Sequence, residues 1–109
     1  MKIEFTAELK DRGCIIHDKD RSARITLIAP SEGLDLNALK ESTERDVLLS
    51  IMPGNFVFHA SIERGGIRYE GDNAWLIKLT VPANDVAQSV KFISYTEKVF
   101  AVQIETEKP

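Results

Sequence analysis

Apolar and polar residues alternate along the first ten residues of the chain and again along residues 56–63. Side chains of a β-strand point alternately to opposite faces, so a period of two predicts a strand with one apolar face. The two stretches are 53 positions apart, which is the first indication of an internal repeat. The apolar positions are Ile3, Phe5, Ala7 and Leu9 in the first stretch, and Phe56, Phe58, Ala60 and Ile62 in the second.

Turn residues and prolines divide the rest of each half into further strands. Glycines in residues 12–15 and 64–67 predict a first hairpin connection in each half, one residue shorter in the second half. Residues 18–21 and 70–73 predict a second turn, because Asp, Asn and Gly tolerate turn conformations. A third strand follows in each half and ends at a proline, which removes a donor from the sheet ladder. Its inward residues and closing proline are Ala23, Ile25, Leu27, Ala29 and Pro30 in the first half, and Trp75, Ile77, Leu79, Val81 and Pro82 in the second.

The spacing of apolar residues changes after each proline and predicts two short helices. In the second half, three valine or isoleucine residues follow a helical period within residues 84–93, where Asn84 can cap the helix. In the first half, Ser31 or Asp35 can cap a helix over residues 36–40.

Each half closes with a further alternating strand, over residues 47–51 in the first and 100–104 in the second. The order strand, strand, strand, helix, strand therefore occurs twice, in about residues 1–54 and 55–107. Each half alone is too short to sustain a core, so we expect the two halves to bury their apolar faces against each other. The pattern predicts a single α+β domain over residues 1–109, with two tandem repeats related by a pseudo-twofold axis, about eight mainly antiparallel strands and two short helices.

Length and composition exclude several classes of protein. The 109 residues suffice for one domain, and 43% apolar with 28% charged residues is typical of a folded globule rather than a disordered chain. No stretch approaches the roughly 20 apolar residues of a membrane-spanning helix, so we expect no membrane association. Cys14 is the only cysteine, which excludes an intramolecular disulfide framework and favours a cytoplasmic setting.

Read cyclically from its third strand, the repeat has the order strand, helix, strand, strand, strand. This order resembles the repeat of DNA sliding clamps. The resemblance implies self-association or additional domains, and helices that line a DNA channel with basic residues. The predicted helices depart from that pattern, because acidic residues accompany Lys40 and Lys91. The resemblance rests on element order rather than on a sequence motif, and it covers residues 23–39, 47–51, 75–93 and 100–104.

A second resemblance is to swapped-hairpin, AbrB-like DNA-binding domains, in which an Arg-Ile-x-Leu-Pro-like strand leads into a short helix. Residues 24–27 and 77–82 carry parts of this pattern. The resemblance implies a basic dimer surface. The local concentration of arginines in residues 12–24 is interrupted by aspartates, which weakens such a surface.

Nucleic-acid binding is therefore one alternative function. Fourteen Lys and Arg against seventeen Asp and Glu give a net charge of -3, which predicts no strong non-specific attraction to phosphate backbones. Exposed aromatic rings beside arginines can still bind bases by stacking. Trp75 is not counted among these rings, because we interpret it as a core residue. The candidate residues are Arg12, Arg21, Arg24, Arg64, Arg68 and Tyr69.

A small enzyme is the other alternative. Cys14 and His17 are candidates for a nucleophile and its base, but residues three positions apart on a strand point to opposite faces. His59 lies on the face opposite Phe58 and Ala60, and we interpret it as an exposed or interface imidazole. No spacing of ligand residues indicates a metal site and no glycine motif indicates a nucleotide cofactor, so we expect no metal, cofactor or small-molecule substrate.

Protein–protein association is the function that the sequence favours. The last strand has a partly apolar second face, because Val99 and Ala101 stand where the first half has Asp46 and Leu48. Exposed apolar side chains and free sheet edges are both sites of association. We therefore expect a non-enzymatic accessory or oligomeric protein that binds a protein partner or a second copy through Val99 and Ala101. Compact chains without a chemical motif also point to an origin in phage or another mobile element.

Overall fold

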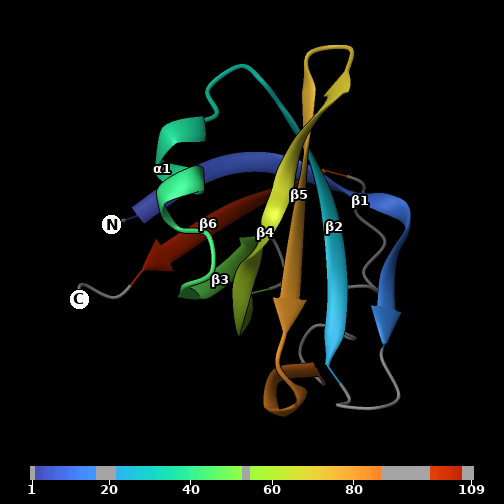
Figure 1. Ribbon diagram of the computed structural model, residues 1–109, viewed down its shortest axis with the longest axis vertical. Helices are drawn as coiled ribbons and strands as arrows, with labels where there is room; N and C mark the ends of the chain where they lie inside the picture. The colour runs from blue at the N-terminus through green and yellow to red at the C-terminus, as the bar shows by residue number, and fades with distance from the viewer. Residues whose placement is uncertain (1, 17–21, 53–54, 87–98, 107–109) are drawn as a thin grey trace.

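The computed structural model describes residues 2–16, 22–52, 55–86 and 99–106. These residues form six strands, one α-helix and one 3-10 turn (Figure 1). In chain order they are β1 (Lys2–Ile16), β2 (Ala23–Pro30), α1 (Leu36–Glu41), β3 (Asp46–Met52), β4 (Phe56–Gly71), β5 (Ala74–Val81), η1 (Ala83–Asp85) and β6 (Phe100–Thr106).

The six strands form one closed antiparallel barrel in the order β1, β2, β5, β4, β3, β6. Each strand pairs with a neighbour on both sides. The predicted α+β class with about eight strands and two helices is therefore wrong, because the described chain is nearly all β. Closure also removes the free sheet edges of the described strands, which were one of the two predicted sites of association.

The two connections predicted as first hairpins are bulges inside the long strands β1 and β4. In β4, residues 63–66 stand opposite the single residue Lys78 of β5, and Gly65 has a φ of 68°. In β1, residues 10–13 stand likewise opposite Thr26 of β2. A bulge bends a strand and strengthens its twist without ending it. The segments on either side of each bulge therefore belong to one strand, and the eight predicted strands become six.

The two halves of the chain pair in equivalent registers. Phe5 of β1 pairs with Val102 of β6, and Phe58 of β4 pairs with Leu49 of β3. A shift of 53 residues between the halves converts the first pair into the second. The same shift carries the bulge of β1 onto the bulge of β4, so the predicted shortening by one residue in the second half is wrong.

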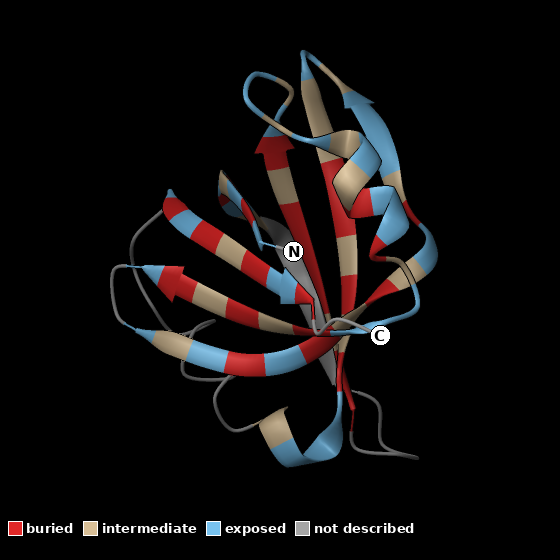
Figure 2. Cartoon of the chain, turned by 90° about the vertical axis from the view of Figure 1, so that its left-hand side faces the viewer, coloured by how far each residue is buried: buried red, intermediate tan, exposed pale blue. Residues whose placement is uncertain are grey.

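Buried residues alternate with more exposed ones along the strands (Figure 2), and buried residues of all six strands form one apolar core. The inward residues predicted for the third and closing strands are buried, with the exception of Trp75, which is half-buried at the start of β5. Fully burying a Leu, Ile or Val side chain stabilises a fold by roughly 1.5–3 kcal/mol. The side chains with 0% exposure are Ala23, Ile25, Leu27, Ala29, Leu39, Ile51, Ile62, Ile77, Leu79, Val81 and Ile104.

Of the two capping residues that the sequence allows for the helix α1, Ser31 and Asp35, the structure uses the second. Asp35 is the N-cap, and its side chain accepts a hydrogen bond from the backbone N–H of Ala38 at 3.1 Å. Leu39 is fully buried and joins α1 to the core of the barrel.

In the described part of the second predicted helix, the 3-10 turn η1 covers Ala83–Asp85, and Val86 follows it in the right-handed helical conformation. Pro82 precedes η1 in an extended conformation and supplies no side-chain cap, because it has no side-chain oxygen. The expected cap Asn84 instead lies inside the turn. Residues 87–93 of the predicted helix, like the predicted turn at residues 18–21, lie outside the described residues.

Candidate functional site

Three neighbouring strands, β1, β6 and β3, present their outward side chains as one exposed face. Thr6 of β1 pairs with Ala101 of β6, and Ala101 pairs in turn with Met52 of β3. Directly paired residues of antiparallel strands have side chains about 5 Å apart on the same face. The adjacent row on this face consists of Glu4, Gln103 and Ser50.

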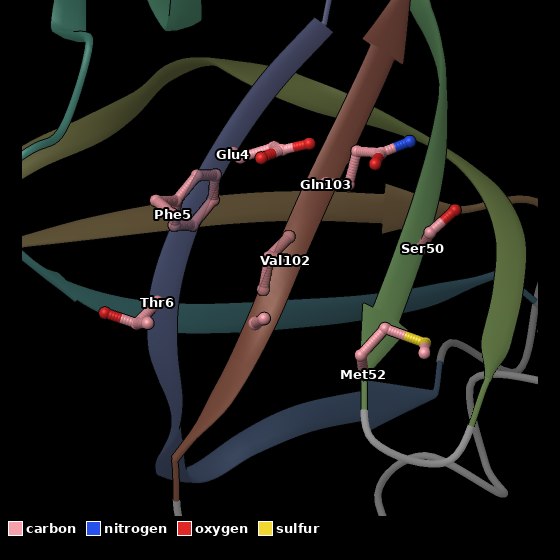
Figure 3. A pocket seen from close by; sticks show the side chains of 8 residues that line it. Glu4, Phe5, Thr6, Ser50, Met52, Val102 and Gln103 are labelled. Atoms are coloured by element: carbon pink, nitrogen blue, oxygen red, sulfur yellow. The ribbon is translucent and has the colours of Figure 1, made fainter.

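These two rows surround a groove of about 430 Å³, which we call the outer groove (Figure 3). Ala101 has only a methyl side chain and stands between the longer side chains of Thr6 and Met52. The small residue leaves a hollow in the middle of the row. The lining residues are Glu4, Phe5, Thr6, Ser50, Met52, Ala101, Val102 and Gln103.

Large apolar side chains are exposed in and around the outer groove. Met52 is 49% exposed, and Val57, which pairs with Ser50 across β3 and β4, is 47% exposed. Val99, directly before β6, is 55% exposed. Both residues predicted for an interface, Val99 and Ala101, are thus exposed, and so are Met52 and Val57. Single exposed apolar residues are ordinary, whereas several on one face indicate a binding surface.

A second hollow of about 290 Å³, which we call the side pocket, adjoins the outer groove at Thr6. The charged residues in the two hollows are Glu4, Glu8 and Asp72, and neither hollow is lined by Lys or Arg. Within the described ranges, no ion pair engages any of these three carboxylates. The side pocket is lined by Thr6, Ala7, Glu8, Ile28, Pro30, Asp72, Asn73, Ala74 and Val99.

Three of the six predicted nucleic-acid residues lie in the first half of the chain. The side chain of Arg12 and the whole of Arg21 lie outside the described residues. Arg24 is described, and its Nε lies 2.7 Å from Oε2 of Glu63. The hydroxyl of Thr80 donates to the same carboxylate oxygen at 3.2 Å. The charge of Arg24 is therefore compensated locally on the outside of β2, β5 and β4.

The other three predicted nucleic-acid residues, Arg64, Arg68 and Tyr69, lie on the exposed part of β4. The ring of Tyr69 meets that of Trp75 edge to face, with centroids 5.3 Å apart and an interplanar angle of 67°. The backbone N–H of Asn73 donates to the Tyr69 hydroxyl at 3.2 Å. The interpretation of Trp75 as a core residue is wrong, because Trp75 is half-buried and packs against Tyr69 at the end of the barrel. This contact holds the Tyr69 ring against the β4–β5 hairpin.

His59 is exposed and is held by one partner. Its backbone N–H donates to Oδ2 of Asp85 in η1, and its Nδ1 lies 3.0 Å from the same oxygen. The contact ties β4 to η1, and the His59 side chain is 59% exposed. Asp46 and Glu105 line a hollow of about 330 Å³ with His59. Nevertheless, no three His, Cys, Asp or Glu side chains of the described chain gather closely enough to hold a metal ion.

The enzyme alternative depends on the pairing of Cys14 with His17. The side chain of Cys14 and the whole of His17 lie outside the described residues. No helix of the described residues is long and apolar enough to cross a membrane.

Sequence reasoning missed most of the outer groove. Met52 continues the outward alternation of Leu48 and Ser50 and was in this sense detectable. Thr6 is an ordinary polar residue, and only the pairing of β1 with β6 brings it beside Ala101.

Comparison with models of protein families, with curated proteins and with solved structures returns no match for this chain.

Proposed function

We propose that this chain is a non-enzymatic binding protein that takes up a short extended segment of a partner protein in the outer groove. The observation that supports this proposal is the groove of about 430 Å³, with exposed Met52 and Ala101 in it and exposed Val57 beside it. Apolar surface that stays in water has no stabilising role in the fold. Its burial against a partner contributes roughly 25 cal/mol per Å² of apolar area.

The size of the face favours a segment over a second folded surface. Three strands about 4.8 Å apart, with two or three outward residues along each, make a face of roughly 200 Å². A stable interface between two folded proteins buries about 800 Å² on each partner. The outer groove therefore suits a short segment better than a second globular surface.

The charges of the face argue against a second copy of this chain as the occupant. A symmetric dimer brings the same patch of both copies together. The acidic part of the patch, which holds Glu4 and Glu8, would then lie close to the acidic part of the other copy's patch, and like charges at close range are unfavourable.

The alternatives predicted from the sequence receive less support. The arginines of a clamp-like nucleic-acid protein do not line the outer groove or the side pocket, and Arg24 is compensated by Glu63. For a small enzyme, the described residues supply the contact between His59 and Asp85, whereas the side chain of the predicted nucleophile Cys14 lies outside them. Binding of a protein segment is therefore the function that we propose.

A selection experiment tests this function. A display library of short random segments is selected against the natural chain, and the enriched segments are then tested against Met52→Glu and against Asn37→Glu. Both variants place a carboxylate at an exposed position, one in the outer groove and one on α1. We expect enriched segments that bind the natural chain and Asn37→Glu equally but lose at least ten-fold in affinity for Met52→Glu. Absence of enrichment, or equal binding to Met52→Glu, would overturn the proposal.

A further inference from the structure

The outer groove and the side pocket form one track across four strands. Met52 of β3, Ala101 of β6 and Thr6 of β1 follow one another in register, and Pro30 of β2 shares the side pocket with Thr6. Thr6 is thus the middle of the track. Apolar residues line both hollows that meet at Thr6, with Met52 and Ala101 in the outer groove and Val99 and Pro30 in the side pocket.

The length of the track sets the length of segment that it can hold. Four strands about 4.8 Å apart span roughly 14 Å from the first to the last. An extended segment rises about 3.3 Å per residue, so about four to five residues cover the track. The segment lies across the strands and contacts side chains, because the closed barrel offers no free strand to extend in its described part.

The middle of the track is acidic. Glu4 and Glu8 flank Thr6 at the two neighbouring outward positions of β1 and are exposed, about 7 Å from it along the strand. Asp72 adds a third carboxylate in the side pocket. Neither hollow is lined by a cationic residue, and none of the three acids takes part in an ion pair with another described residue. A cation placed over Thr6 would therefore meet two carboxylates that form no ion pair with another described residue.

We infer that the segment bound here has the order apolar, basic, apolar. One apolar side chain enters the outer groove beside Met52 and Ala101, and the other enters the side pocket beside Val99 and Pro30. A Lys or Arg between them lies over Thr6, between Glu4 and Glu8. This inference rests on the proposed function of the outer groove and specifies the chemistry of its partner.

Three capped peptides of about five residues, identical except for a core of Leu-Lys-Leu, Leu-Ser-Leu or Leu-Glu-Leu, test the inference. Amide chemical-shift titration detects even millimolar binding and identifies the residues that respond. We expect Leu-Lys-Leu to bind about five-fold more tightly than Leu-Ser-Leu, because an exposed ion pair contributes modestly, and Leu-Glu-Leu to bind most weakly. The advantage of Leu-Lys-Leu should shrink as salt is raised.

The variant Glu4→Gln with Glu8→Gln provides the decisive comparison, and Glu41→Gln on α1 is its matched control. Both changes are at exposed positions, and unchanged thermal unfolding confirms that the fold is retained. We expect the double variant to bind Leu-Lys-Leu and Leu-Ser-Leu equally, and Glu41→Gln to keep the preference. Equal binding of these two peptides to the natural chain, abolished by Met52→Glu, would overturn the inference and leave the proposed function standing. Absence of shifts at the outer groove with all three peptides would overturn both.

Discussion

Gly66 shows how a single residue without a side chain permits the bend of β4. A Cβ atom at this position would lie 2.9 Å from the carbonyl oxygen of Glu63 and 3.1 Å from that of Lys78. Both distances are shorter than the 3.3–3.6 Å at which carbon and oxygen atoms usually meet. Its neighbour Gly65 has open space around it but a φ of 68°, which L-residues adopt at a cost. The two glycines therefore serve the bulge in different ways, one sterically and one conformationally.

Replacing Gly66 by Ala should destabilise the fold by about 2 kcal/mol, because the added methyl group must displace backbone atoms of β4 and β5. The free energy of unfolding, measured by urea titration, checks this value. The exposed neighbouring change Arg64→Ala is the control and should stay within about 0.5 kcal/mol of the natural chain. If Gly66→Ala unfolded at the same urea concentration as the natural chain, β4 would not pass as close to β5 as described.

At the scale of single elements, the alternation of apolar residues predicts most strands correctly, whereas local turn chemistry predicts their ends less well. Asp72 and Asn73 have φ values of 54° and 58° and form the tight turn between β4 and β5 that was predicted there. Gly65 has a similar φ but lies in a bulge. Glycine favours positive φ in both settings, so the sequence alone does not separate a hairpin from a bulge. The pairing of Ile67 with Ile77 of β5 shows that the strand continues after Gly65, so this glycine lies in a bulge.

The cap of α1 makes a prediction at the same scale. Replacing Asp35 by Ala removes the side chain that accepts from Ala38, and we expect a loss of about 1 kcal/mol. Thermal unfolding followed by circular dichroism should show the midpoint lowered by roughly 4–8 °C. Ser31→Ala, the change at the other cap that the sequence allowed, should leave the midpoint nearly unchanged. A larger effect from Ser31→Ala than from Asp35→Ala would contradict the described start of the helix.

At the scale of the whole molecule, the sequence predicts which residues point inward but not which strands become neighbours. Val99 and Ala101 were identified because the alternation of one strand exposes them. The outer groove exists only because β6 lies between β1 and β3, which come from distant parts of the chain. These pairings are long-range, and periodicity within a single strand carries no information about them. The same pairings close the barrel and so remove the sheet edges through which association was also expected.

The closed barrel and its acidic track together predict the state of the protein in solution. No described strand offers a free edge to a second copy, and the exposed apolar face is small and bordered by Glu4, Glu8 and Asp72. We expect light scattering to give the mass of one chain across micromolar concentrations. Met52→Glu should leave that mass unchanged, because we expect no second copy to bind this face. If the natural chain were instead a dimer that Met52→Glu dissociates, a second copy would occupy the outer groove. The acidic residues beside the groove would then have to meet basic residues from another face of that copy.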